Sequence, residues 1–108
     1  MLINKVYGLL GLCTRAGKIV SGMDAVSDEI RRNKVKLLIV AEDASKKTIE
    51  NIKYLAEKKN IKVVVIGNIQ NNSKAIGKEN RAIIGIKDKN IADGIIKIIY
   101  GGEAFGEN

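Results

Sequence analysis

The chain has 108 residues and a formal net charge of +7, and 45% of its residues are hydrophobic while 29% are charged. These values are typical of one soluble globular domain that buries its own core, and the excess of basic residues favours a polyanionic partner. The absence of His and the single Cys exclude histidine-dependent catalysis, His-ligated zinc, an internal disulfide and a four-cysteine metal site.

The first half of the chain predicts two helices and two strands. Apolar residues recur at three- and four-residue steps over residues 2–13, which predicts an amphipathic helix, with Gly17 as a left-handed cap behind it. Residues 18–20 predict a short strand. Residues 37–41 form a nearly unbroken apolar run, as expected of a strand buried on both faces.

The helix between these two strands has its own start and stop signals. Ser21 and Asp24 fit the two halves of a capping box, and the apolar stripe that follows continues to Ile30. Arg31 and Arg32 suit the negative end of such a helix.

The second half continues the alternation of helices and strands. A narrow apolar stripe over 49–56 predicts a helix, and 63–66 predicts a second buried strand. A short helix is expected around 74–76, a strand over 82–86, and a last helix over 91–101. The pattern predicts a three-layer α/β domain with a small, mostly parallel sheet, comprising residues 1–102 and followed by a flexible tail at 103–108. No apolar run has the roughly 20 residues of a membrane helix, and no signal segment opens the chain, so we expect a cytoplasmic protein without membrane contact.

The basic excess is uneven along the chain. Residues 1–36 carry seven basic and three acidic side chains, which is more than half of the net charge. Two basic stretches are candidate RNA contacts: 15–24, where a turn leads into a helix N-terminus, and the polar loop 77–81. The four aromatic residues include no pair on a predicted strand, so we expect contacts to RNA backbone, groove shape and a few base edges rather than base stacking.

Catalysis has little support in the sequence. Glu42 and Asp43 follow a buried strand, where they could hold Mg²⁺ or act as acid and base, or else stabilise the N-terminus of the next helix. Cys13 falls at an apolar helical spacing and is expected to be a buried thiol. Neither a phosphate-loop pattern nor a dinucleotide fingerprint is present. We therefore expect a non-enzymatic protein that needs no cofactor or metal.

Several segments resemble one known family when they are taken in order. They are the turn 16–22, the strand and Glu-Asp run over 37–44, and the loop 74–79. Together they resemble the L7Ae family of kink-turn-binding ribosomal proteins, and within it the bacterial YlxQ-like branch. The resemblance covers about residues 3–100 and implies an α-β-α sandwich with a four-stranded mixed sheet. It also implies binding to kink-turn RNA, a helix–bulge–helix element with tandem G·A pairs.

The resemblance implies which residues contact RNA. In the family, the start of the second helix enters the groove at the G·A pairs, and the loop before the last strand packs on the bulged nucleotides. In this chain the expected RNA-binding residues are Lys18, Gly22, Met23, Asp24, Lys78, Glu79, Asn80 and Arg81.

This chain departs from the family pattern at three positions. The family has an Asn-Glu pair and a later Lys where this chain has Asp24, Ala25 and Asp28. These residues motivate an alternative, a protein-interaction or scaffold module that kept the fold but lost kink-turn specificity. The main prediction is a monomeric, non-catalytic protein that binds structured RNA, such as ribosomal RNA, and is associated with the ribosome.

Overall fold

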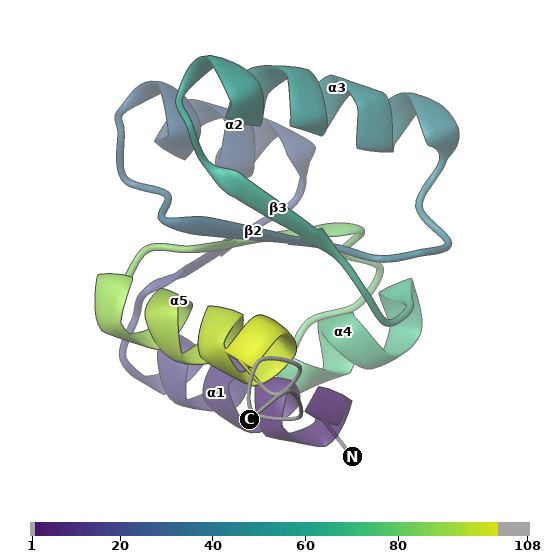
Figure 1. Ribbon diagram of the computed structural model, residues 1–108. Coiled ribbons are helices and arrows are strands. Elements are labelled where there is room, and N and C mark those ends of the chain that lie inside the picture. Colours follow the sequence, from purple (N-terminus) through teal and green to yellow (C-terminus); the bar gives the residue numbers. More distant parts are fainter. Residues whose placement is uncertain (1, 102–108) are drawn as a thin grey trace.

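The computed structural model describes residues 2–101, which form one sheet between two layers of helices (Figure 1). The helices α2 (Met23–Arg31) and α3 (Lys46–Lys58) cover one face of the sheet. The other face is covered by α1 (Leu2–Arg15), α4 (Ile69–Ala75) and α5 (Lys89–Ile96). The three-layer α-β-α sandwich is therefore confirmed. The expected tail at 103–108 and the final residue of the expected domain, 102, lie outside the described part of the chain.

The four strands form a mixed sheet, as the family resemblance implies. They are β1 (Ile19–Ser21), β2 (Leu37–Val40), β3 (Lys62–Val65) and β4 (Ile83–Ile86), in the order β1-β4-β2-β3. β2 and β3 are parallel, whereas β4 is antiparallel to both β1 and β2, so the expectation of a mostly parallel sheet is wrong. The reason is the length of α4: seven residues span only about 10 Å, too short to return the chain to the opposite end of the sheet.

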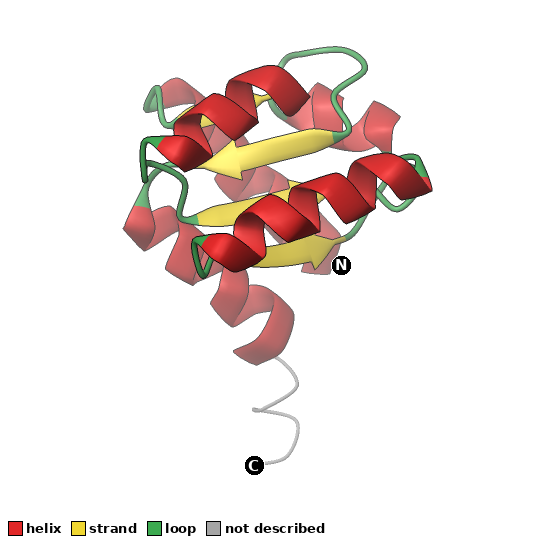
Figure 2. Cartoon of the chain, turned by 90° about the horizontal axis from the view of Figure 1, so that it is seen from above, coloured by secondary structure: helices red, strands yellow, loops and turns green. Residues whose placement is uncertain are grey.

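The core lies on both faces of the central strand β2. Leu37 and Ile39 pack with α1 and α5, while Leu38 and Val40 pack with α2 and α3. All four side chains are fully buried, which confirms the prediction of a strand covered on both faces. Seen from above, the helices of the α2–α3 layer lie along the strands beneath them (Figure 2).

The start of α2 differs from the prediction. Ser21 is the last residue of β1 and pairs with Ile84, so it does not cap the helix. The N-cap is Gly22, whose φ of 90° lies in the region that favours glycine, and no side chain caps the helix there. The predicted capping box is wrong because the strand leads directly into the helix, and the first backbone N–H groups of α2 therefore lack a side-chain cap.

The polar helix α4 is longer than predicted. It begins at Ile69 because the Asn68 side chain accepts a hydrogen bond from the backbone N–H of Asn71 at 2.7 Å. Its buried residues are the polar Asn72 and Ser73, which carry no apolar periodicity.

The last helix also changes character along its length. After Ile96, α5 continues as a single π-helical turn over Lys97–Gly101, labelled η1. No helix within residues 2–101 combines the length and the apolar character needed to cross a membrane.

Candidate nucleic-acid interface

Backbone hydrogen bonds tie four turns together at one end of the sheet. β1, β2 and β3 end here and β4 begins here. With N···O distances of 2.9 to 3.0 Å, these bonds join Gly22 to Ile83, Ala41 to Ala82, and Glu42 to Gly67. We call the turns at 22–24, 41–43, 67–70 and 77–82 the candidate edge.

Arg81 contacts the start of α2. A Cβ atom added to Gly22 would lie 3.4 Å from Nη1 of Arg81, so the guanidinium lies against the N-terminal turn of the helix. Within residues 2–101, the buried Nε of Arg81 has no hydrogen-bond partner. Two of the predicted RNA-binding residues, far apart in sequence, are therefore neighbours, and the Arg81 guanidinium lies beside the uncapped N–H groups that open α2.

The loop before β4 is held by a buried serine. Ser73, 1% exposed, accepts a hydrogen bond from the Arg81 N–H at 2.7 Å and donates one to the Arg81 carbonyl at 3.2 Å. Two residues of the loop adopt the left-handed backbone conformation, Gly77 with a φ of 71° and Asn80 with a φ of 55°. The loop therefore has a defined backbone although Lys78, Glu79 and Asn80 are exposed.

A groove of about 750 Å³ lies between this loop and α4. It brings together the predicted residues Lys78, Glu79 and Asn80. It also includes residues that sequence analysis missed: Ile69, Gln70, Ser73 and Lys74. Their only sequence signal was Asn68, a favourable N-cap residue before a polar run.

Met23 and Asp24 face a different hollow. It measures about 530 Å³, lies between α2 and α3, and also contains Asp28 and Tyr54. Asp28 pairs with Arg32 at 3.4 Å on the exposed side of α2. Asp24, in the first turn of α2, therefore places a carboxylate beside the uncapped N–H groups of the helix.

The structure separates Lys18 from the other predicted residues. Lys18 precedes β1, whereas Gly22 follows it, so the strand places about 13 Å of backbone between them. Lys18 thus lies at the end of the sheet opposite the candidate edge. The predicted stretch from Lys18 to Asp24 is not one turn.

The two acidic residues after β2 do not form an evident metal site. Asp43 accepts a hydrogen bond from the Ile69 N–H at 2.8 Å and so stabilises the start of α4, not of the helix that follows it in sequence. Among the described residues, no three His, Cys, Asp or Glu side chains are grouped to hold a metal ion.

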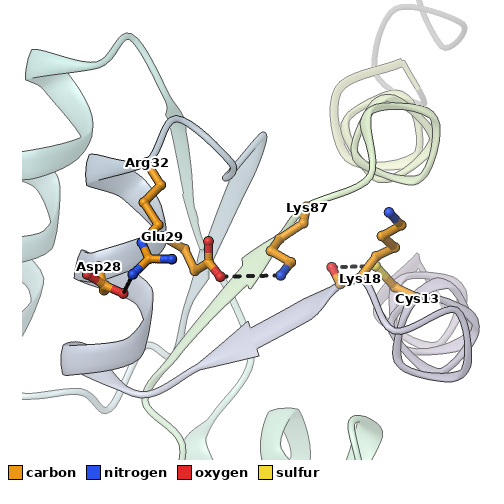
Figure 3. Close-up of polar contacts among 6 residues, drawn as sticks. All are labelled: Cys13, Lys18, Asp28, Glu29, Arg32 and Lys87. Carbon is orange, nitrogen blue, oxygen red and sulfur yellow. Dashed lines mark hydrogen bonds and ion pairs between the residues drawn. The ribbon is translucent and has the colours of Figure 1, made fainter.

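Cys13 is buried, as predicted. Its Sγ donates to the Lys18 carbonyl at 3.3 Å (Figure 3). Burial raises the pKa of the thiol, and the Asp88 carboxylate raises it further. The residue therefore has a structural role and is a poor nucleophile.

Comparison with known proteins identifies the family. Residues 4–94 match the model of the ribosomal protein L7Ae/L30e/S12e/Gadd45 family. The chain is 34% identical over 96 residues to the RNA-binding protein YlxQ of Bacillus subtilis (strain 168), covering 86% of this chain and 93% of that protein. It is 31% identical over 98 residues to the RNA-binding protein YlxQ of Enterococcus faecium, covering 91% and 94%.

Solved structures agree with this assignment. A protein of unknown function from Bacillus halodurans C superposes with a TM-score of 0.85 at 33% identity, over 88% of this chain and 96% of that one. The Giardia lamblia 15.5kD RNA binding protein has the same fold, with a TM-score of 0.79 at 20% identity over 95% and 88% of the two chains. The chain belongs to the L7Ae/L30e/S12e/Gadd45 family and, like its relatives, is not an enzyme.

Proposed function

We propose that this family member binds structured RNA at the candidate edge. The observation that carries the proposal is the contact between the Arg81 guanidinium and the Gly22 turn that opens α2. The names of the two curated relatives, both RNA-binding proteins, agree with it.

The chemistry of this contact suits a phosphate group. The first backbone N–H groups of α2, a helix of nine residues, have no side-chain cap, and the helix dipole makes that end positive. Arg81 adds the planar guanidinium, whose Nη1 lies at the Gly22 turn, as a further donor group. Together these groups provide several donors for one anionic ligand.

The specific ligand we propose is kink-turn RNA. The start of α2 and the loop 77–81 are adjacent, which lets them contact the G·A pairs and the bulged nucleotides, respectively, of one RNA element. We further propose that the RNA is ribosomal or another structured cellular RNA, and that the protein acts in the cytoplasm as a monomer. Residues 1–102 would form the single RNA-binding domain.

Replacing Arg81 with Gln should weaken kink-turn binding by about tenfold or more, since a charge-assisted hydrogen bond contributes roughly 1.5–3 kcal/mol. Melting temperature should change little, because the loop is held through the Arg81 backbone. The measurement is a titration of a short kink-turn RNA, beside a duplex without the G·A pairs, at near-physiological salt. We expect the wild type to bind the kink-turn at least tenfold more tightly.

The matched control is Lys97→Gln, which removes one exposed positive charge from η1, outside the four turns of the candidate edge. It should change kink-turn affinity by less than about threefold, since exposed charges act weakly at a distance. Equal binding of kink-turn and plain duplex by the wild type would rule out kink-turn specificity. Equal losses in Arg81→Gln and Lys97→Gln would show that Arg81 acts only through net charge.

The second candidate is a protein-interaction module. Asp24 and Asp28 are exposed and line the hollow between α2 and α3, where carboxylates oppose phosphate binding. The test is whether a stoichiometric protein partner stays bound after nuclease treatment. If it does, and if the protein binds kink-turn RNA no more tightly than duplex, this second function replaces the first.

A further inference from the structure

The end of the sheet opposite the candidate edge carries a lysine at every strand. Lys18 precedes β1, Lys36 precedes β2, Lys62 begins β3 and Lys87 follows β4. The Lys87 N–H donates to the Lys18 carbonyl at 2.8 Å, and the Lys36 N–H donates to the Ile86 carbonyl at 2.7 Å. With strands about 4.8 Å apart, the row Lys18, Lys87, Lys36, Lys62 extends for about 14 Å.

Two loops add further cations to this row. The segment 31–36 contains four basic residues and the segment 58–62 contains three, and neither contains an acidic one. The Lys59 ammonium donates to the Asn33 side chain at 3.1 Å, so the two loops are neighbours. We call Lys18, Lys87 and the segments 31–36 and 58–62 the basic edge.

Few of these nine cations are neutralised. Within residues 2–101, ion pairs form only at Arg32, with Asp28, and at Lys87, with Glu29, both at 3.4 Å (Figure 3). The side chains of all nine except Lys87 are exposed. The basic edge therefore concentrates uncompensated positive charge at the surface.

Helix dipoles explain only part of this concentration. Cations in the last turns of α2 and α3 are stabilised by the negative helix ends. The strand-end lysines gain no such stabilisation, since sheets have small net dipoles. By contrast, the candidate edge carries only two basic side chains, Lys78 and Arg81, against four acidic ones. The net charge of the protein is therefore concentrated away from its candidate edge.

We propose that the basic edge is a second nucleic-acid contact surface, which binds the phosphate backbone of double-helical RNA without reading its sequence. Lysine ammonium groups act as mobile point charges, and a row of about 14 Å spans several phosphates. The surface does not suit insertion into a lipid bilayer. Among the described residues, the exposed large hydrophobic side chains are Leu2, Leu12, Tyr54 and Tyr100, none of which belongs to the basic edge. The two tyrosines lie beside it, with the ammonium groups of Lys58 and Lys62 over their rings.

The test uses the triple variant Arg31→Gln/Lys34→Gln/Lys36→Gln and an RNA duplex of about 16 base pairs with no kink-turn. These three side chains are exposed and make no ion pair within residues 2–101, so the fold should be unaffected. We expect at least a tenfold loss of duplex affinity. The slope of log affinity against log salt should fall by about 2 to 3, since each lost phosphate contact contributes roughly 0.9.

The matched control is Lys5→Gln/Lys53→Gln/Lys97→Gln, which removes the same charge from exposed positions on α1, α3 and η1. The duplex affinity of this control should fall by less than about threefold. Equal losses in the two triple variants, or no loss in either, would overturn the proposal. Loss of binding to anionic lipid vesicles with unchanged duplex binding would assign the surface to a membrane instead.

Arg81→Gln separates this inference from the proposed function. That variant should keep duplex binding, and the basic-edge triple variant should keep the preference for kink-turn over duplex. A wild type that binds duplex through the basic edge but shows no kink-turn preference would refute only the kink-turn proposal. Duplex binding that is lost in Arg81→Gln and intact in the triple variant would refute only the second surface.

Discussion

Replacing Gly67 with Ala should lower the free energy of unfolding by roughly 3 kcal/mol or more, the largest effect we expect from a single methyl group in this protein. Gly67 has a φ of 66°, which costs a residue with a Cβ roughly 1–2 kcal/mol. The added Cβ would also overlap Oδ1 of Asn72 and lie 2.6 Å from the hydroxyl of Tyr7. Both groups must move, and both are constrained by their own hydrogen bonds.

Gly77 is the matched control for this measurement. Its φ of 71° is nearly the same, but a Cβ added there would meet no heavy atom within 4 Å beyond its own chain neighbours. Gly77→Ala should therefore show only the conformational cost, roughly 1–2 kcal/mol. Urea denaturation of both variants separates steric conflict from backbone strain. Equal losses of stability in the two variants would mean that the Asn72 and Tyr7 side chains move aside without an energetic cost.

The contact at Gly67 links the core to the groove. The phenol of Tyr7, from α1, donates to Oδ1 of Asn72, and Nδ2 of Asn72 donates to the Ile66 carbonyl at 3.0 Å. Burial raises the pKa of Tyr7, which keeps the phenol protonated as a donor. The turn between β3 and α4 is thus fixed by the first helix, through a contact between residues 65 positions apart in the sequence.

The apolar framework could be predicted from the sequence because it depends on local spacing. The stripe of Val6, Leu10 and Cys13 is buried as its helical period indicates. The run that became β2 is apolar at each of its positions, which only a strand covered on both faces requires. Gly17, with φ 70°, adopts the left-handed conformation predicted for it.

The features that were mispredicted depend on contacts distant in sequence. Ser21 has the residue type of a helix cap, but pairing with Ile84 keeps it in β1. The buried side of α4 is polar because Asn72 and Ser73 bond to other turns, so no apolar period marks it. β4 is antiparallel to β2 because α4 is too short to return the chain to the opposite end of the sheet. The residue types in α4 do not reveal this.

The candidate site was predictable as segments but not as an arrangement. Gly22 and Arg81 were both predicted, and the structure brings them into contact. Lys18 was grouped with Gly22 because they are close in sequence, yet β1 separates them and Lys18 joins the basic edge. A count of charges along the chain therefore detects the basic excess without showing that most of it lies at the other end of the sheet.

Replacing Ser73 with Ala should both destabilise the protein and weaken RNA binding. The buried hydroxyl bonds to both the N–H and the carbonyl of Arg81, and its loss leaves two half-buried backbone groups without that partner. We expect roughly 2 kcal/mol of lost stability, within the 1–3 kcal/mol range for an unsatisfied buried group. Kink-turn affinity should fall about fivefold to tenfold, because binding must then order the loop 77–81.

Ile95→Val is the control that separates loop order from stability. Ile95 is fully buried on α5, away from the loop, and the change should cost about 1 kcal/mol. Hydrogen exchange at the Arg81 amide should accelerate in Ser73→Ala beyond the change in global stability, but not in Ile95→Val. If Ser73→Ala binds kink-turn RNA like wild type while its Arg81 amide exchanges faster, the loop need not be held in advance, and the start of α2 alone determines affinity.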